Sequence, residues 1–324
     1  MSSASTTLQE KLASPTLRGH IQIMRIDHWV KNVFVLPGIV IALTELPTDL
    51  RADWWWTVLA GMLSVSLVAS SNYTINEVLD APFDRLHPTK HLRPVPSGRV
   101  SIPLAYIQWI ALFAAGLATA LAVSRPFAIT MAALWIMGCI YNIPPIRSKD
   151  LPYVDVLSEA VNNPLRMLAG WYMITSRLAP PGSLLMSYWM VGCYFMAIKR
   201  FAEYRSIGNR RTSAAYRKSF EHYDEKRLLI SIMFYAAHAM LFFGAFLIRY
   251  RMELILAFPM VALVMCQYLA IGFKPDGGAE KPEQLYKERG LMASVISCAA
   301  ILVVLMFVRI PQVYTFFAPL TRPH

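Results

Sequence analysis

Nine long apolar segments alternate with polar, charged stretches along the chain. Most are long enough to cross about 30 Å of hydrocarbon as α-helices. The first is short and is expected to continue back to about residue 21 as an amphipathic lead-in. The pattern predicts an all-α integral membrane protein, with spans at residues 33–45, 54–79, 101–122, 127–143, 154–175, 183–202, 228–247, 252–272 and 291–308.

Composition supports this interpretation. Of the 324 residues, 56% are hydrophobic, and the mean hydropathy is +0.42, which excludes an ordinary soluble domain. Since no linker rich in Pro, Gly or Ser separates the spans, we predict one helical bundle at residues 21–308. A polar N-terminal arm at residues 1–20 and a tail at residues 309–324 flank this bundle.

The net charge of +11 is unevenly placed. Most Lys and Arg residues fall in the N-terminal arm and in the second, fourth, sixth and eighth loops. This asymmetry predicts a multi-pass protein of the cell (inner) membrane whose N-terminus and even-numbered loops are cytoplasmic. Such a face attracts anions, either lipid head groups or a phosphorylated substrate. Nucleic acid is a poor partner, because the basic residues are split among short loops.

The second span ends in a polar motif. Asn76, Asp80 and Asp84 are spaced by four residues and share one face of a helix. Their oxygen atoms suit Mg²⁺, which completes its shell with water and substrate phosphates. We therefore predict a Mg²⁺–diphosphate site; the alternative is a capped helix end with solvated acids. Pro82 is expected to kink or fray the helix, which would put Asp84 on the loop side.

Cations follow this motif. Lys90 and Arg93 come directly after it and are expected to meet the phosphates, although both could simply be positive-inside residues. The fourth span runs into a second polar segment that contains Tyr141, Arg147 and Lys149. Because both segments follow even-numbered spans, they lie on one face of the membrane and can converge on one site.

Arg166 lies well inside the fifth span, where a charge is costly unless it faces a polar cavity or a partner. We expect it to contact a substrate phosphate, with Asn162 one turn away as polar lining. An ion pair of Arg166 with Asp155 or Glu159 is the structural alternative.

The sixth span ends in Lys199, Arg200, Glu203 and Tyr204, which we predict to bind substrate. Lys and Arg commonly snorkel at such helix ends, and Glu203 is spaced to pair with Lys199. The N-terminal segment at residues 25–32 supplies one more candidate substrate-binding residue, Lys31. That segment could instead be an interfacial anchor.

Together these residues resemble the UbiA superfamily of intramembrane prenyltransferases. The resemblance covers nearly the whole chain, through Arg-x-x-x-Trp-x-Lys-Asn at 25–32, Asn-x-x-x-Asp-x-x-x-Asp at 76–84, Arg-Pro-x-x-Ser-Gly at 93–98 and Tyr-Asn-x-Pro-Pro-x-Arg at 141–147. It implies nine transmembrane helices around a cytoplasm-facing cavity. It also implies two Asp-rich motifs that bind a diphosphate through Mg²⁺.

The chain departs from that pattern twice. Glu77 stands where the family usually carries Asp. The second Asp-rich motif is replaced by the Lys199–Tyr204 segment and by a basic stretch that includes Arg210, Arg211 and Arg217. This replacement resembles the branch of decaprenyl-phosphate phosphoribosyltransferases, as do residues 87–90, 212–219 and 276–278. The loop at 141–147 is more similar to ordinary prenyltransferases.

The resulting hypothesis is Mg²⁺-dependent transfer of 5-phosphoribosyl from phosphoribosyl diphosphate to a polyprenyl phosphate. Asp80, Asp84 and Asn76 would hold the metal, and Lys90 and Arg93 the leaving pyrophosphate. The remaining cations would hold the other phosphates, and Glu203 or Tyr204 a ribose hydroxyl. The alternatives are a prenyltransferase with an aromatic or other small acceptor, and a transporter or lipid scaffold. The branch resemblance is also compatible with a homo-oligomer.

Overall fold

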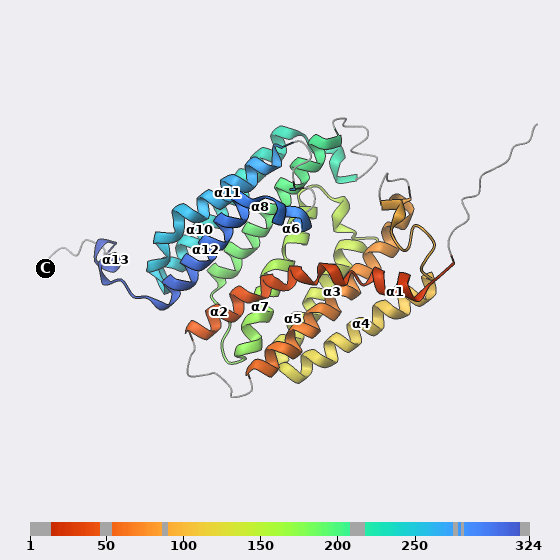
Figure 1. The fold of residues 1–324 in the computed structure, drawn as a ribbon, viewed down its shortest axis with the longest axis horizontal. Helices are drawn as coiled ribbons and strands as arrows, with labels where there is room; N and C mark the ends of the chain where they lie inside the picture. The colour runs from red at the N-terminus through yellow and green to blue at the C-terminus, as the bar shows by residue number, and fades with distance from the viewer. Residues whose placement is uncertain are drawn as a thin grey trace, which may run out of the picture.

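A computed structural model describes residues 14–45, 54–85, 90–207, 218–274, 278–279 and 282–317. In these ranges every regular element is a helix (Figure 1). The α-helices are α1 (Leu17–Ile23), α2 (Leu36–Glu45), α3 (Trp54–Asp84), α4 (Ile102–Val123), α5 (Arg125–Asn142), α6 (Val154–Ala160), α7 (Asn162–Ile174), α8 (Gly182–Ile207), α10 (Glu225–Tyr250), α11 (Phe258–Gly272), α12 (Arg289–Phe307) and α13 (Pro311–Phe316). The 3₁₀ helices are η1 (Ile26–Val35), η3 (Lys90–Leu92), η4 (Ser148–Asp150), η5 (Lys218–Glu221), η6 (Met252–Ala257) and η7 (Pro282–Lys287).

The all-helical membrane fold is confirmed. Each of the nine predicted spans corresponds to one helix or to two consecutive helices in the described part of the chain. Six helical segments are long and apolar enough to cross a membrane by themselves: Leu17–Thr44, Trp54–Asp84, Ile102–Val123, Glu225–Tyr250, Met252–Gly272 and Arg289–Phe307. The chain is therefore an integral, multi-pass membrane protein.

Two spans are less regular than the hydrophobic pattern predicts. The fifth is divided at Val161 into α6 and α7. Pro164 lies in the first turn of α7 and has no N–H to give to the carbonyl of Ala160, so the ladder of helical hydrogen bonds is interrupted there. The first span has a ten-residue 3₁₀ helix, η1, in front of α2, where an amphipathic lead-in was expected.

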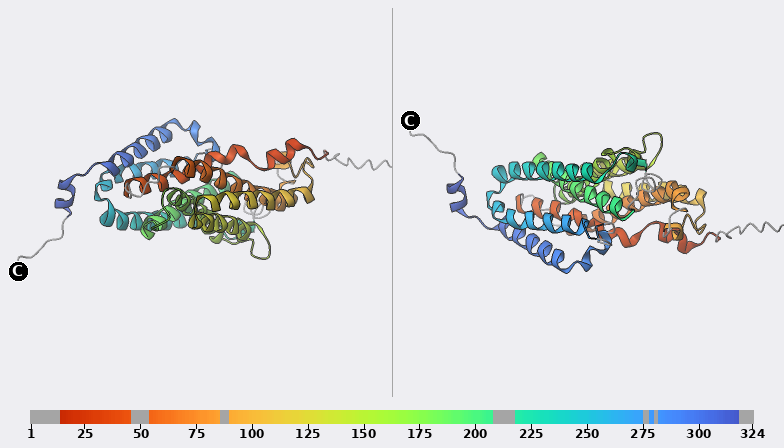
Figure 2. Two further views of the ribbon diagram at one scale, coloured as in Figure 1. Left: turned by 90° about the horizontal axis from the view of Figure 1, so that it is seen from below. Right: turned by 90° about the horizontal axis from the view of Figure 1, so that it is seen from above.

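The helices form two packed groups (Figure 1). In one, α3, α4, α5 and α7 enclose a core around Val68, Phe127 and Met131. In the other, α8 packs along α10 and also contacts α11, with Phe201 and Ile232 in its core. Helix α12 lies on the outer face, where it contacts α2 (Figure 2). The short helices α1 and α13 lie at opposite ends of the bundle (Figure 1).

Glycines let α2 approach α7 closely. A Cβ atom on Gly38 would lie 1.9 Å from the carbonyl oxygen of Met167, and one on Gly170 would lie 2.1 Å from that of Val35. Helices can come this close only where neither carries a side chain. The close approach fixes η1 and α2 against α7.

Some predicted features fall outside the described residues. These are residues 1–13 of the N-terminal arm, the His-Pro-Thr stretch at 87–89, the basic segment with Arg210, Arg211 and Arg217, Asp276 with Gly277, and the tail beyond residue 317.

Candidate active site

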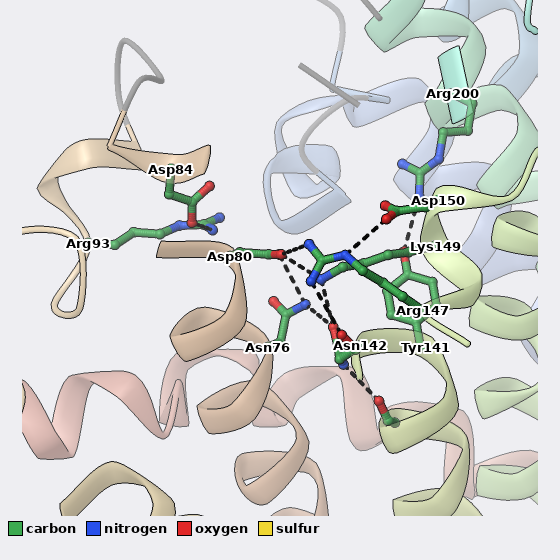
Figure 3. A network of polar contacts seen from close by, with 11 residues as sticks. Asn76, Asp80, Asp84, Arg93, Tyr141, Asn142, Arg147, Lys149, Asp150 and Arg200 are labelled. Carbon is green, nitrogen blue, oxygen red and sulfur yellow. Dashed lines mark hydrogen bonds and ion pairs between the residues drawn. The ribbon is translucent and has the colours of Figure 1, made fainter. Parts of the chain in front are cut away.

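Asp80 is the centre of a polar network that joins α3 to the segment after α5. Its carboxylate accepts hydrogen bonds from the Nζ of Lys149 at 2.6 Å and from Arg147 at 3.0 Å. The Asn76 amide nitrogen lies 3.3 Å from Asp80 and 2.6 Å from the Asn142 oxygen, which also accepts from Lys149 at 2.9 Å. Figure 3 shows these side chains converging between the two helices. The predicted convergence of the two polar segments is thus confirmed.

Asn142 was not among the predicted site residues. It lies beside Tyr141 at the end of α5, and its amide nitrogen donates to the carbonyl of Gly138 at 2.8 Å. That bond leaves its oxygen for Asn76 and Lys149. The signal in the sequence was an amide residue at the very end of an apolar helix.

The segment after α5 is bent so that its cations face α3. Arg147 has a left-handed backbone with φ of 34°, which is unfavourable for a residue other than glycine. Two carboxylates hold its guanidinium, those of Asp80 and of Asp150 at 3.1 Å, and the ring of Phe83 lies 5.3 Å away. Lys149 follows in η4 and is buried, with a side-chain exposure of 7%.

Asp84 lies one turn beyond Asp80 and has a different partner. Helix α3 continues through Pro82 as far as Asp84, so fraying at the proline and a loop-side Asp84 are wrong, while a kink at Pro82 stays a prediction. The buried Asp84 carboxylate accepts a hydrogen bond from Arg93 at 2.6 Å. Figure 3 shows Asp84 and Arg93 set apart from the cluster of side chains around Asp80. Lys90 lies near this pair in sequence, in η3.

Glu77 points away from this network. Only 1% of it is exposed. It accepts hydrogen bonds from Arg25 at 3.2 Å and from the backbone N–H of Val95 at 3.1 Å. These contacts tie the N-terminal segment and the loop before α4 to α3. Glu77 therefore has a structural role in which a shorter Asp would not reach the same partners.

The Arg200 guanidinium is bound by side chains of neighbouring helices and of its own helix. Its Nε donates to Asp155 at 3.0 Å and one terminal nitrogen donates to Glu203 at 2.9 Å. The other terminal nitrogen lies 3.5 Å from the Tyr141 hydroxyl. With 2% of the residue exposed, Arg200 is not a snorkelling side chain. It links α8 to α6 and to the end of α5.

Asp155, fully buried at 0% exposure, is the second member of this link. Besides Arg200 it accepts a hydrogen bond from the Tyr223 hydroxyl at 2.6 Å. Burial and the Asp155 carboxylate together raise the pKa of Tyr223 above its usual range, so the hydroxyl remains a donor. Sequence reasoning named Asp155 only as a partner for Arg166, and nothing in its spacing indicated the contact with Tyr223.

Of the remaining predicted residues, Tyr204 and Lys199 lie on α8 and Arg166 lies on α7. The Tyr204 ring packs edge-on against Phe220 at 6.4 Å. Lys199 is half-buried, and its electrostatic neighbours include Glu203, Glu159 and Lys31. Farther along α7, Arg166 pairs with no carboxylate among the described residues, so the expected alternative of an ion pair with Asp155 or Glu159 is wrong.

The donors at the end of α3 fit Mg²⁺ in kind. Two carboxylates and an amide are hard oxygen ligands, and Mg²⁺ commonly takes one or two carboxylates plus phosphates and water. A group of three or more His, Cys, Asp or Glu side chains arranged for a metal is absent from the described ranges. Since Asp80 and Asp84 are paired with cations here, these residues suit a metal that arrives with phosphate oxygens.

Comparison with known proteins agrees with the sequence motifs. The family model of the UbiA prenyltransferase family matches residues 33–296. A decaprenyl-phosphate phosphoribosyltransferase of Mycobacterium tuberculosis is 33% identical over 65% of this chain and 67% of its own length. A digeranylgeranylglyceryl phosphate synthase of Saccharolobus solfataricus is 32% identical over 39% of this chain and 42% of its own length.

The fold also matches solved structures. A UbiA homologue from Archaeoglobus fulgidus, solved with GPP and Mg²⁺ bound, superimposes with a TM-score of 0.67. The match covers 92% of this chain and 99% of the other at 22% identity. At that identity the likeness concerns the fold alone.

Proposed function

This chain belongs to the UbiA prenyltransferase family, and from that premise we propose that it transfers 5-phosphoribosyl from phosphoribosyl diphosphate to a polyprenyl phosphate. The family makes it a membrane transferase. The choice of substrates is our inference from the charges around the site and from the relatives named decaprenyl-phosphate phosphoribosyltransferase.

One observation carries the proposal. The end of α3 supplies two carboxylates. The end of α8, where the family resemblance implies a second acidic motif, instead supplies Lys199 and Arg200 with one carboxylate, Glu203, which is paired with Arg200. A prenyl diphosphate brings one diphosphate to the site. Phosphoribosyl transfer brings a diphosphate, a 5-phosphate and a lipid phosphate, and so requires more cations and fewer acids.

The reaction requires displacement at C1 of the ribose. An oxygen of the lipid phosphate forms the new bond to C1, and the C1–O bond to pyrophosphate breaks with its electron pair leaving on pyrophosphate. No general base is required, because a phosphate monoester is already ionised at pH 7. The enzyme must neutralise the leaving group and exclude water from the oxocarbenium-like carbon.

The residues around Asp80 suit this task. Asp80, Asp84 and Asn76 would hold Mg²⁺, which supplies Lewis-acid stabilisation of the pyrophosphate when bound. Lys149 and Arg147, now on Asp80, lie where they could turn to phosphate oxygens, and Arg93 could do the same beside Asp84. Glu203 and Tyr204 remain candidates for a ribose hydroxyl. Arg200, engaged with Asp155, would position these groups.

A second candidate is the transfer of a prenyl group from its diphosphate to an aromatic or other small acceptor. The similarity to digeranylgeranylglyceryl phosphate synthase favours it, as does the fold shared with a homologue that binds GPP and Mg²⁺. Both reactions expel pyrophosphate from a carbon that tolerates positive charge, so the end of α3 could serve either.

The test is a transfer assay on purified protein in detergent with Mg²⁺. Radiolabelled phosphoribosyl diphosphate and a polyprenyl phosphate are supplied, and label is counted in the organic phase. We expect labelled lipid. In a parallel reaction, a prenyl diphosphate is supplied with aromatic acceptors. Prenylated product there, with no labelled lipid in the first reaction, would replace phosphoribosyl transfer with the second candidate.

A further inference from the structure

Four polar side chains outside the Asp80 network come from η1, α7 and α8, which pack against one another. We call them the deep basic cluster: Lys31, Asn162, Arg166 and Lys199. Lys199 interacts electrostatically with Lys31 and with Glu159, one turn before Asn162. On the other side, Arg166 interacts with Tyr188.

Tyr188 brings the two sides of the cluster together. Its hydroxyl donates to the carbonyl of Phe34 at 3.2 Å, one 3₁₀ turn after Lys31. Lys31 is thus linked to Lys199 directly and to Arg166 through Phe34 and Tyr188. The members of the cluster therefore surround one region between η1, α7 and α8.

Contacts along α3 give the depth of this region. Trp29 donates to Ser70 and Asn32 donates to Ser66, so Lys31 lies level with that part of α3. At 1.5 Å per residue, Asp80 is about 15–21 Å further along the helix axis. Lys31 consequently lies well away from the carboxylates at the end of α3.

Helix geometry brings the side chains of Arg166 and Lys199 toward one level. Helices α6 and α7 run antiparallel to α8, since Asn163 lies against Gly192 while Asp155, earlier in the chain, meets Arg200. Helical side chains point toward the N-terminus of their own helix. On two antiparallel helices, Arg166 therefore reaches back toward Asn162, and Lys199 reaches down toward the same level.

Two atoms in this region lack partners. The Nε of Arg166 and the Oδ1 of Asn162 are buried and make no hydrogen bond within the described part of the chain. Buried polar atoms are nearly always paired, so such orphans require an explanation. Because the two ends of an amide are interchangeable, rotation would present the Asn162 NH₂ group instead. Both residues are then ready donors for an anion.

The charge of the region indicates which anion. Lys31, Arg166, Lys199 and Arg200 carry four positive charges, and Glu159, Glu203 and Asp155 carry three negative charges. The excess of positive charge favours an anion such as a phosphate monoester. Because Glu203 and Asp155 are both bound to Arg200, the cluster has little to offer a metal.

We propose that the deep basic cluster is a subsite for a phosphate monoester that binds without a metal. The inference rests on the proposed function, which requires such a group on both substrates: the head of a polyprenyl phosphate and the 5-phosphate of the sugar. The end of α3 then takes the metal-bound diphosphate, and the cluster takes the second anion.

The test is direct binding in EDTA. Purified protein in detergent is titrated calorimetrically with farnesyl phosphate and with ribose 5-phosphate, and farnesol is the control for binding of the lipid chain alone. We expect at least one monoester to bind. Arg166→Gln or Lys199→Gln is expected to weaken binding at least tenfold, and Arg166→Lys to restore part of it. The surface variant Arg249→Gln should leave monoester binding unchanged.

Each result decides a point. Binding of farnesyl phosphate alone assigns the cluster to the lipid, and binding of ribose 5-phosphate alone assigns it to the sugar. The proposal is overturned if neither monoester binds to wild-type protein, if farnesol binds as tightly as farnesyl phosphate, or if folded Arg166→Gln and Lys199→Gln proteins bind normally. The transfer assay is separate: monoester binding without transfer would reject the proposed function and retain the subsite.

Discussion

Glu77 and Asp80 are three residues apart on α3, yet their surroundings give them different roles. Glu77 is buried against Arg25 and the backbone of Val95, whereas the Asp80 side chain is 23% exposed and faces Lys149 and Arg147. An acidic motif therefore contains both a structural acid and a candidate ligand.

Glu77→Gln is expected to destabilise the protein without changing its response to Mg²⁺. The substitution breaks the ion pair with Arg25 in a buried setting, which costs about 1–3 kcal/mol. Thermal unfolding in detergent measures the loss of stability. The control is Glu225→Gln at an exposed pair with Arg205, which should cost less than about 1 kcal/mol. Equal losses in both variants would contradict the structural role of Glu77.

At the residue scale, the sequence predicted which residues share a helix face better than which side chains pair between helices. The four-residue spacing correctly placed Asn76 beside Asp80, because helix geometry alone decides it. The pairing of Arg200 with Asp155 could not be predicted, because it depends on how α6 packs against α8. Whether these residues bind substrate stays a prediction.

At the scale of elements, one buried carboxylate connects α6, α8 and the segment before α10. Asp155 receives Arg200 from α8 and Tyr223 from that segment. The link holds α6 and the preceding η4, which carries Lys149, at a fixed distance from α8. Loss of the Asp155 contacts should therefore make the position of Lys149 less well defined.

Tyr223→Phe removes the hydroxyl that donates to Asp155. A hydrogen bond to a charged group contributes about 1.5–3 kcal/mol, so we expect a matching loss of thermal stability. Tyr250→Phe is the control, because Tyr250 is exposed at the end of α10. An unchanged melting temperature for Tyr223→Phe would show that the link is not stabilising.

The crossing of α2 and α7 gives a second prediction at this scale. Gly170→Ala should destabilise by about 1–3 kcal/mol, because its Cβ would meet the carbonyl of Val35 at 2.1 Å. The matched control is Gly244→Ala, which meets nothing within 4 Å and should be neutral or stabilising by up to about 1 kcal/mol. Thermal unfolding of both variants provides the comparison, and the reverse order would contradict the close packing.

Hydrophobic patterning predicted the elements well, since the length and apolar character of a membrane helix are local properties. It missed the division at Val161 and the 3₁₀ helix before α2. A missing hydrogen bond at Pro164 does not change hydrophobicity, and the contacts of Trp29 and Asn32 with α3 join segments far apart in the sequence.

For the whole molecule, the distribution of charge carries the proposed orientation. The ends of α3, α5 and α8 meet at one end of the bundle, and Arg147, Lys149 and Arg200 are there. The positive-inside rule predicts that this end faces the cytoplasm. A homo-oligomer, with which the branch resemblance is compatible, stays a prediction that a mass measurement in solution can test.

Cysteine labelling from each side tests the orientation. Asp27→Cys lies at the proposed cytoplasmic end, where the native side chain is 78% exposed. Ser176→Cys lies in the exposed connection between α7 and α8 at the other end. In intact cells a membrane-impermeant maleimide should label Ser176→Cys and spare Asp27→Cys until the membrane is opened. The opposite pattern would invert the orientation.

The most direct test of the account measures labelled-lipid formation by wild-type protein, Asp80→Asn and the exposed control Asp27→Asn across a Mg²⁺ titration. Removing one ligand and its charge from a metal-bound leaving group should lower kcat by about 10²–10³-fold. Asp27→Asn should retain wild-type activity, and EDTA should abolish activity in all three proteins. Full activity of Asp80→Asn at the same Mg²⁺ concentration would contradict the assignment of Asp80 as the centre of the active site.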